Sequence, residues 1–184
     1  TAYVAHPYQF PVIGWPSDIE NWKIQDLKDF YTTYYAPNNA TMFVVGAVDA
    51  KDVISRIEKR FAAIPSQPEP RAVTTIEPEQ QGERRLVVEK ENVSTPYLGM
   101  AWHIGNAQSE DQRPLTLLRS ILAEGEASRL HQRLVEKEQL ALGLGSMQDE
   151  GFDPGLVWIY AMLPPGGDTA RVERIIHEEI ARLA

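Results

Sequence analysis

The 184-residue sequence contains no cysteine, which excludes disulfides, thiol nucleophiles and zinc sites with thiolate ligands. Its longest apolar run, around Met42 to Val48, is interrupted by Gly46 and is much shorter than the roughly 18 residues of a membrane-spanning segment. Positive charge is also scarce, because 26 acidic against 18 basic residues give a net charge of −8, which argues against nucleic acid and anionic membranes as partners. An apolar fraction of 43% is sufficient for a folded core.

The compact motifs of common catalytic sites are missing as well. The four histidines are far apart in the sequence: His6, His103, His131 and His177. Neither H-E-x-x-H nor H-x-x-E-H occurs, and no P-loop, G-x-G-x-x-G or G-x-S-x-G motif is found. Two acids follow His177, but adjacent helix positions point about 100° apart and do not easily share one ion. We therefore predict no catalytic, cofactor-binding or metal-binding residue in this chain.

The first 64 residues alternate between extended and helical patterns. Three early prolines predict extended coil from Tyr3 to Trp15, and apolar residues at helical spacing predict a helix from Ile24 to Tyr34. An apolar run at 41–47 predicts a strand that is buried on both faces, and Asp49 is placed to cap the next helix. The early aromatics Tyr8, Phe10 and Trp15 either pack locally or line a peptide-binding chamber.

Residues 65–82 are rich in proline, serine, glutamine and glutamate and predict a linker. The pattern after the linker predicts two strands, two helices, a hairpin and a final helix. Their expected ranges are 85–90, 96–104, 111–125, 128–140, 142–148 with 156–163, and 168–180. This order predicts an α+β fold with a mainly antiparallel sheet and helices packed on one face. The chain begins without Met and stops within a helical pattern, so we expect it to be a piece of a longer protein.

Two groups of residues in order resemble a known family. The first contains His6-Pro7-Tyr8 and, further on, Tyr34-Tyr35-Ala36-Pro37-Asn38-Asn39 followed by Val44-Val45-Gly46. The second contains Ile121-Leu122-Ala123-Glu124-Gly125, then Ser128-Arg129-Leu130 and the segment from Leu134 to Leu142. Together they resemble the insulinase-type (M16) zinc metallopeptidases, the family of mitochondrial processing peptidase and pitrilysin.

The resemblance implies a non-catalytic part of such an enzyme. The family's H-x-x-E-H motif lies N-terminal to the matched region, so zinc is expected in the parent enzyme or a partner subunit and not in this segment. Within residues 1–184 we expect the end of a first family domain at 1–64, the linker at 65–82 and the start of a second domain at 83–184. The implied partners are a peptide or unfolded protein substrate and a second M16-type domain or subunit.

One departure from the family concerns substrate orientation. Competent second domains carry an arginine and, seven residues later, a tyrosine, where this sequence has Val135 and Leu142. Neither side chain donates a hydrogen bond, and we expect both to belong to the core together with Leu134. The loss fits the zinc-bearing chain of a two-subunit peptidase, and it fits equally a structural or assembly subunit without a role in proteolysis. By analogy with the family, a periplasmic location is favoured over a cytoplasmic one.

Overall fold

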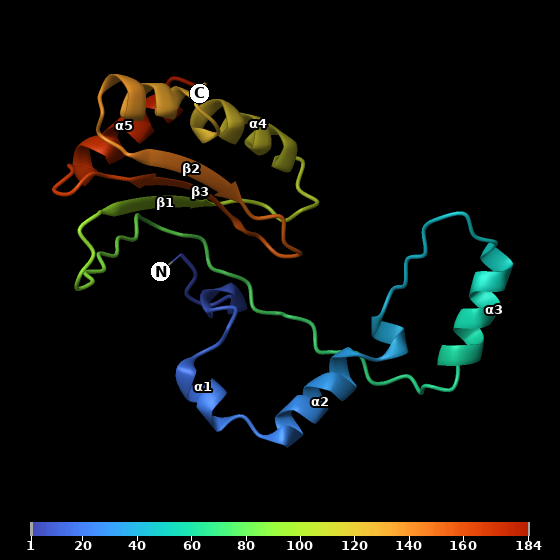
Figure 1. Cartoon of the computed structure of the whole chain (residues 1–184). Coiled ribbons are helices and arrows are strands. Elements are labelled where there is room, and N and C mark those ends of the chain that lie inside the picture. The colour runs from blue at the N-terminus through green and yellow to red at the C-terminus, as the bar shows by residue number, and fades with distance from the viewer. Residues whose placement is uncertain (1, 184) are drawn as a thin grey trace. The chain divides into compact units, whose positions relative to one another are not determined.

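The computed structural model describes residues 2–183, and the chain divides into two compact units, residues 1–86 and 87–184 (Figure 1). The first unit is helical and the second contains a sheet. The predicted linker, residues 65–82, contains neither helix nor strand. The division into family domains stays a prediction.

Between residues 2 and 86, the first unit contains three α-helices and two short 3₁₀ turns. The helices are α1 (Pro16–Asn21), α2 (Ile24–Tyr34) and α3 (Ala50–Phe61), and the turns are η1 (Pro7–Gln9) and η2 (Pro37–Asn39). Helix α2 has the predicted bounds. The Asp49 carboxylate accepts a hydrogen bond of 2.9 Å from the Asp52 N–H, which confirms the predicted cap of α3.

Two predicted strands are absent from the described structure. Residues 41–47 are extended but form no strand, and Phe43 and Val45 are 85% and 96% exposed. Residues 85–90 also form no strand. A strand is held by hydrogen bonds to a neighbouring strand, and no described residue pairs with either segment. Both predictions are wrong in this structure. An apolar sequence favours a strand, but it does not supply the neighbouring strand with which the strand must form hydrogen bonds.

The second unit confirms the predicted α+β fold. Its strands β1 (Tyr97–His103), β2 (Gly143–Gln148) and β3 (Leu156–Met162) form an antiparallel sheet in the order β1-β3-β2. Helices α4 (Gln112–Ala123) and α5 (Thr169–Ala181) lie on the same face of the sheet (Figure 1). The predicted hairpin is therefore β2–β3, and the last predicted helix is α5, whose N-terminus is capped by Asp168.

The hydrophobic core lies between this sheet and its helices. Its largest fully buried side chains are Leu130, Leu134, Leu163, Val172 and Ile176. Leu98, Met100 and Trp102 alternate along β1 and pack against the same cluster, as predicted. Complete burial of a leucine or valine stabilises a fold by about 1.5–3 kcal/mol, so these side chains are the main reason that the second unit has a defined structure.

The segment predicted as a helix from Ser128 to Leu140 differs in type. It contains the π-helix η3 (His131–Lys137), and the Glu138 N–H donates to the Arg133 carbonyl oxygen at 2.9 Å, an i to i+5 bond. The Ser128 hydroxyl donates to the Gly125 carbonyl oxygen at 2.7 Å and does not accept from the following turn. Asp111 precedes α4 as predicted, but its side chain makes no capping hydrogen bond.

Candidate functional site

The segment that resembles the family's Arg/Tyr region begins within η3, at Leu134 and Val135, and ends at Leu142, directly before β2. Leu134 is fully buried and Val135 packs partly against the core, whereas Leu142 is 55% exposed. The expectation that all three are core residues is therefore wrong for Leu142. Ala141 faces the core, and successive residues of an extended chain point to opposite sides, so Leu142 points outward.

An ion-pair network holds η3 against α5. The Arg133 guanidinium lies 2.5 Å from the Glu178 carboxylate, 2.8 Å from that of Glu179 and 3.1 Å from that of Glu138. The hydrogen bond to Glu178 is the main cause that raises the pKa of Arg133 above its ordinary value. For Glu138, the hydrogen bond from Arg133 is the main cause that lowers the carboxyl pKa. We interpret the network as a structural clamp.

Glu179 is the buried centre of this clamp. Its side chain is 4% exposed and accepts hydrogen bonds from three arginines, at 2.9 Å from Arg129, 2.8 Å from Arg133 and 2.6 Å from Arg182. Burial raises the carboxyl pKa, but the hydrogen bonds from Arg133 and Arg129 outweigh burial and lower it overall. The two acids after His177, weighed as metal ligands in the sequence, thus bind guanidinium groups.

A second carboxylate interaction, which is partly buried, lies in the first unit, within the predicted linker. The Glu77 carboxylate accepts hydrogen bonds from the N–H groups of Val4, Ala5 and His6 at 2.8–2.9 Å. Burial raises its pKa, but these three bonds, with the Arg84 guanidinium at 3.6 Å, lower it to about 2. Part of the predicted linker therefore holds the N-terminal segment.

The early aromatics have two environments. Tyr8 packs edge-on against the ring of His6, with ring centroids 4.5 Å apart, and near Tyr3. Phe10 and Trp15 are exposed. Local packing thus accounts for Tyr8, whereas the chamber-lining alternative stays a prediction for Phe10 and Trp15.

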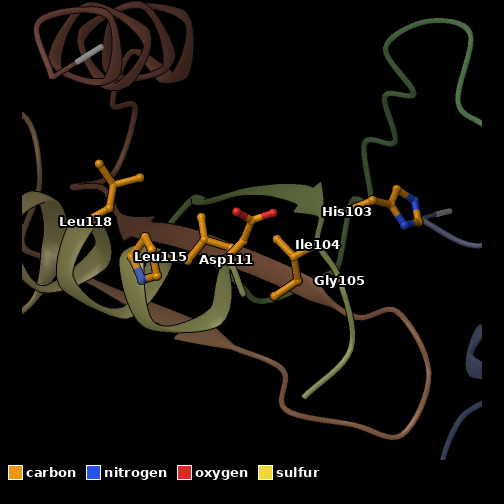
Figure 2. A pocket seen from close by; sticks show the side chains of 7 residues that line it. His103, Ile104, Gly105, Asp111, Leu115 and Leu118 are labelled. Atoms are coloured by element: carbon orange, nitrogen blue, oxygen red, sulfur yellow. The ribbon is translucent and has the colours of Figure 1, made fainter. Parts of the chain in front are cut away.

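A shallow open pocket of about 570 Å³ lies where β1 ends and α4 begins. It is lined by His103, Ile104, Gly105, Asp111, Pro114, Leu115 and Leu118. Figure 2 shows the His103 ring pointing away from the Asp111 carboxylate, so these two polar groups do not converge. The arrangement lacks the convergent polar groups typical of a small-molecule site.

The described residues do not fit a zinc ion. A catalytic zinc site uses about three protein ligands. Between residues 2 and 183, no group of three or more histidine, aspartate or glutamate side chains is placed to hold a metal. Among the same residues, no helix combines the length and apolar character needed to cross a membrane.

The sheet face opposite the helices is apolar and exposed. We call Tyr97, Met147, Trp158 and Tyr160 the outer face; all four are exposed. They share one face because residues that are paired across an antiparallel sheet point the same way, and the register pairs Ala101 with Trp158 and Met147 with Trp158. Tyr97 of the outer face belongs to β1, which is an edge strand of the described sheet.

The second unit has two layers, helices and a sheet with an exposed apolar outer face, and residues 2–183 contain no metal-ligand cluster. Comparison with known families identifies the family of the chain. Residues 21–184 match the family described as the peptidase M16 inactive domain, so the chain belongs to the M16 peptidase family. This result confirms the resemblance to the zinc metallopeptidases.

Curated relatives and a solved structure agree with this assignment. Zinc protease PqqE of Helicobacter pylori is 33% identical over 189 residues, which cover 100% of this chain and 41% of that protein. An uncharacterized zinc protease of Mycobacterium leprae is 26% identical over 97% of this chain and 40% of its own length. A crystal structure of a protease from Helicobacter pylori superposes with a TM-score of 0.91 at 31% identity, covering 100% of this chain and 45% of that one. This chain thus spans about two fifths of the curated relatives.

A more distant structure supports the fold alone. The crystal structure of a peptidase M16 inactive domain from Pseudomonas fluorescens superposes with a TM-score of 0.80 at 22% identity, covering 98% of this chain and 43% of that one.

Sequence reasoning missed three features that the structure brings together. Glu77 meets residues 4–6 across about seventy positions of sequence, and Glu179 meets Arg129 and Arg133 across about fifty. No local pattern signals such pairs. The outer face had a weak signal, because Trp158 and Tyr160 alternate with inward residues along the predicted hairpin.

Proposed function

We propose that this chain is a non-catalytic part of an M16 zinc metallopeptidase that helps to enclose and hold extended peptide substrate. In this proposal the zinc and the catalytic groups lie outside this segment, in the parent enzyme or a partner subunit. The parent is a zinc metalloendopeptidase, and the chain by itself does not cleave peptides.

The observation that carries the proposal is the match of residues 21–184 to the M16 inactive domain. The relatives named zinc proteases are more than twice as long as this chain, so they have room for a zinc-bearing domain outside the matched part. We further propose that residues 1–64 end a first family domain, that 65–82 connect, and that 83–184 begin the second.

A second candidate function is a structural or assembly subunit without a role in proteolysis. It rests on one observation, namely that Val135 and Leu142 replace the family's hydrogen-bonding pair, a loss that fits this candidate and the zinc-bearing chain of a two-subunit peptidase equally. The two candidates differ in peptide affinity, because a subunit used only for assembly needs none.

The experiment is a binding assay in which the purified chain is added to a mixture of unstructured peptides. Fluorescence anisotropy of the peptides measures the binding. Saturable peptide binding supports the proposed peptide-holding function, and the absence of binding supports the assembly subunit. Zinc content and peptide cleavage are measured on the same sample. Zinc near one equivalent per chain, or cleavage that a chelator abolishes, would contradict a non-catalytic segment.

A further inference from the structure

We propose that Arg129 and Arg182 form a binding site for a carboxylate of an acidic peptide segment that is supplied from outside this chain. The segment can belong to a substrate or to a partner subunit. The inference therefore goes beyond the proposed function and does not depend on it.

Both arginines lie beside the buried carboxylate of Glu179. The Arg129 Nε and Nη2 atoms are each 2.9 Å from Glu179 Oε2, and the Arg182 Nη1 atom is 2.6 Å from Glu179 Oε1. Arg129 lies just before η3, and Arg182 is the residue that ends α5. Because the two guanidinium groups contact the two oxygens of one carboxylate, the fold holds them next to each other.

Neutralising Glu179 does not require both of these residues. Arg133 also donates to Glu179 Oε1, at 2.8 Å, and one guanidinium group is sufficient to pair one buried carboxylate. Within residues 2–183 the whole network joins four arginines to three glutamates, namely Arg129, Arg133, Arg171 and Arg182 with Glu138, Glu178 and Glu179. The network thus has an excess of positive charge in a chain whose net charge is −8. Neighbouring like charges repel each other, and an external anion offsets this repulsion.

The outward edges of the two guanidinium groups are available to such an anion. The side chains of Arg129 and Arg182 are 34% and 58% exposed. Among the described residues, the hydrogen bonds to Glu179 use Nε and Nη2 of Arg129 and Nη1 of Arg182, which leaves Nη1 of Arg129 and Nε and Nη2 of Arg182 for another acceptor. A guanidinium group has more than one edge that matches the two oxygens of a carboxylate. Each arginine can therefore hold Glu179 and a second carboxylate at the same time.

The contacts with Glu179 also indicate which ligand fits. The same two guanidinium groups already bind a carboxylate at 2.6–2.9 Å, which is the length of a charge-assisted hydrogen bond. Because Glu179 is buried and holds both arginines in place, an external carboxylate orders fewer side chains on binding than it would at isolated surface arginines. Aspartate and glutamate side chains supply this carboxylate in a peptide.

The test is fluorescence anisotropy at low salt with two dye-labelled peptides about seven residues long, close to the ordinary length of an extended segment in a protein. The first peptide alternates glutamate with serine, and the second has glutamine in place of each glutamate. Inorganic phosphate is titrated as a competitor. The chain variants are Arg129→Gln and Arg182→Gln, with Arg174→Gln as a matched control. Arg174 is an exposed arginine of α5 that, within residues 2–183, does not belong to the network.

We expect the glutamate peptide to bind and the glutamine peptide to bind at least about tenfold more weakly. Arg129→Gln and Arg182→Gln should each weaken binding of the glutamate peptide roughly fivefold to twentyfold, whereas Arg174→Gln should change the Kd less than about twofold. Glu178→Gln should have the opposite sign and strengthen binding, because it removes a negative charge from the network and leaves both arginines in place. Added salt should weaken binding in every case. Thermal unfolding by circular dichroism checks that each variant is folded.

Four results would overturn the inference. Equal binding of the two peptides would exclude a carboxylate site. Binding of the glutamate peptide that Arg129→Gln and Arg182→Gln change no more than Arg174→Gln would place the acidic peptide elsewhere. Phosphate binding that requires both arginines, without binding of the glutamate peptide, would mean an adventitious ion only. If neither phosphate nor the glutamate peptide binds, the network has a purely structural role.

The proposed function is read separately on the same samples. Arg129→Gln and Arg182→Gln should leave the binding of uncharged unstructured peptides unchanged. Failure of the carboxylate site is therefore distinguished from failure of the peptide-holding function.

Discussion

The substitution Glu179→Gln tests the clamp between η3 and α5. Glutamine keeps the size of the side chain and one acceptor oxygen, but it removes the charge that faces Arg129, Arg133 and Arg182. It also places an amide donor against guanidinium donors. Because the Glu179 carboxylate is buried, we expect the second unit to lose stability.

The expected loss is about 2 kcal/mol in the free energy of unfolding. Removing one partner of a fully buried pair costs about 3–5 kcal/mol. Here the side chains of Arg129 and Arg182 are 34% and 58% exposed, so water screens both charges and the cost is lower. For a unit of about 100 residues, about 2 kcal/mol lowers Tm by roughly 8–16 °C.

The assay is thermal unfolding by circular dichroism at several pH values, with the exposed Glu126 changed to glutamine as a control. The folded-state pKa of Glu179 is lowered, so its stabilisation is complete above the unfolded value of about 4.3. It is lost as the pH falls through the lower folded value. The difference in Tm between wild type and Glu179→Gln should therefore be full at neutral pH and shrink below about pH 4.

Two outcomes would refute this reasoning. One is an unchanged Tm for Glu179→Gln at neutral pH, which would mean that the network adds nothing to stability. The other is a difference in Tm that persists undiminished in acid, which would mean that the loss does not come from the charge. The Glu126→Gln control should unfold together with wild type at every pH.

Three further predictions concern packing and the N-terminal segment. Leu134→Ala should lower the free energy of unfolding by about 2–5 kcal/mol in urea denaturation, and the exposed Leu142→Ala by less than about 1 kcal/mol; equal losses would contradict the observed burial. Gly167→Ala should lower the free energy of unfolding by about 1–3 kcal/mol, because the new Cβ would lie 2.8 Å from the Leu163 Cβ and 2.9 Å from the Pro164 carbonyl oxygen. At the control position, the Cβ of Gly143→Ala would meet no atom within 4 Å, so the same assay should show a much smaller change in the free energy of unfolding. Glu77→Gln should speed hydrogen exchange of amides 4–6 at neutral pH, while exposed Glu79→Gln should not. In wild type this protection is complete above the ordinary pKa of 4.5 and is lost only as the pH falls towards about 2; loss of protection already near pH 4.5 would contradict the lowered pKa of Glu77.

The candidate site was only partly predictable. The apolar alternation of β1 and the hairpin pattern at 142–148 with 156–163 are local signals, and both indicated the correct strands. The open edge of β1 was not predictable, since strand order depends on which strands meet across the fold. For the same reason the exposure of Leu142 was missed, because it depends on where η3 ends and β2 begins.

The sequence by itself determined the α+β class, the helices α2, α3 and α5, the hairpin β2–β3 and the family. These follow from periodicity, caps, turns and motif order, which act over a few residues at a time. Only the tertiary structure decided that 41–47 form no strand here, that η3 is a π-helix, that Glu179 gathers three arginines and that β1 lies at an edge. The missing strand, the Glu179 contacts and the edge position of β1 depend on residues distant in sequence, and the free energy of such a contact is set by burial and geometry that no local pattern contains.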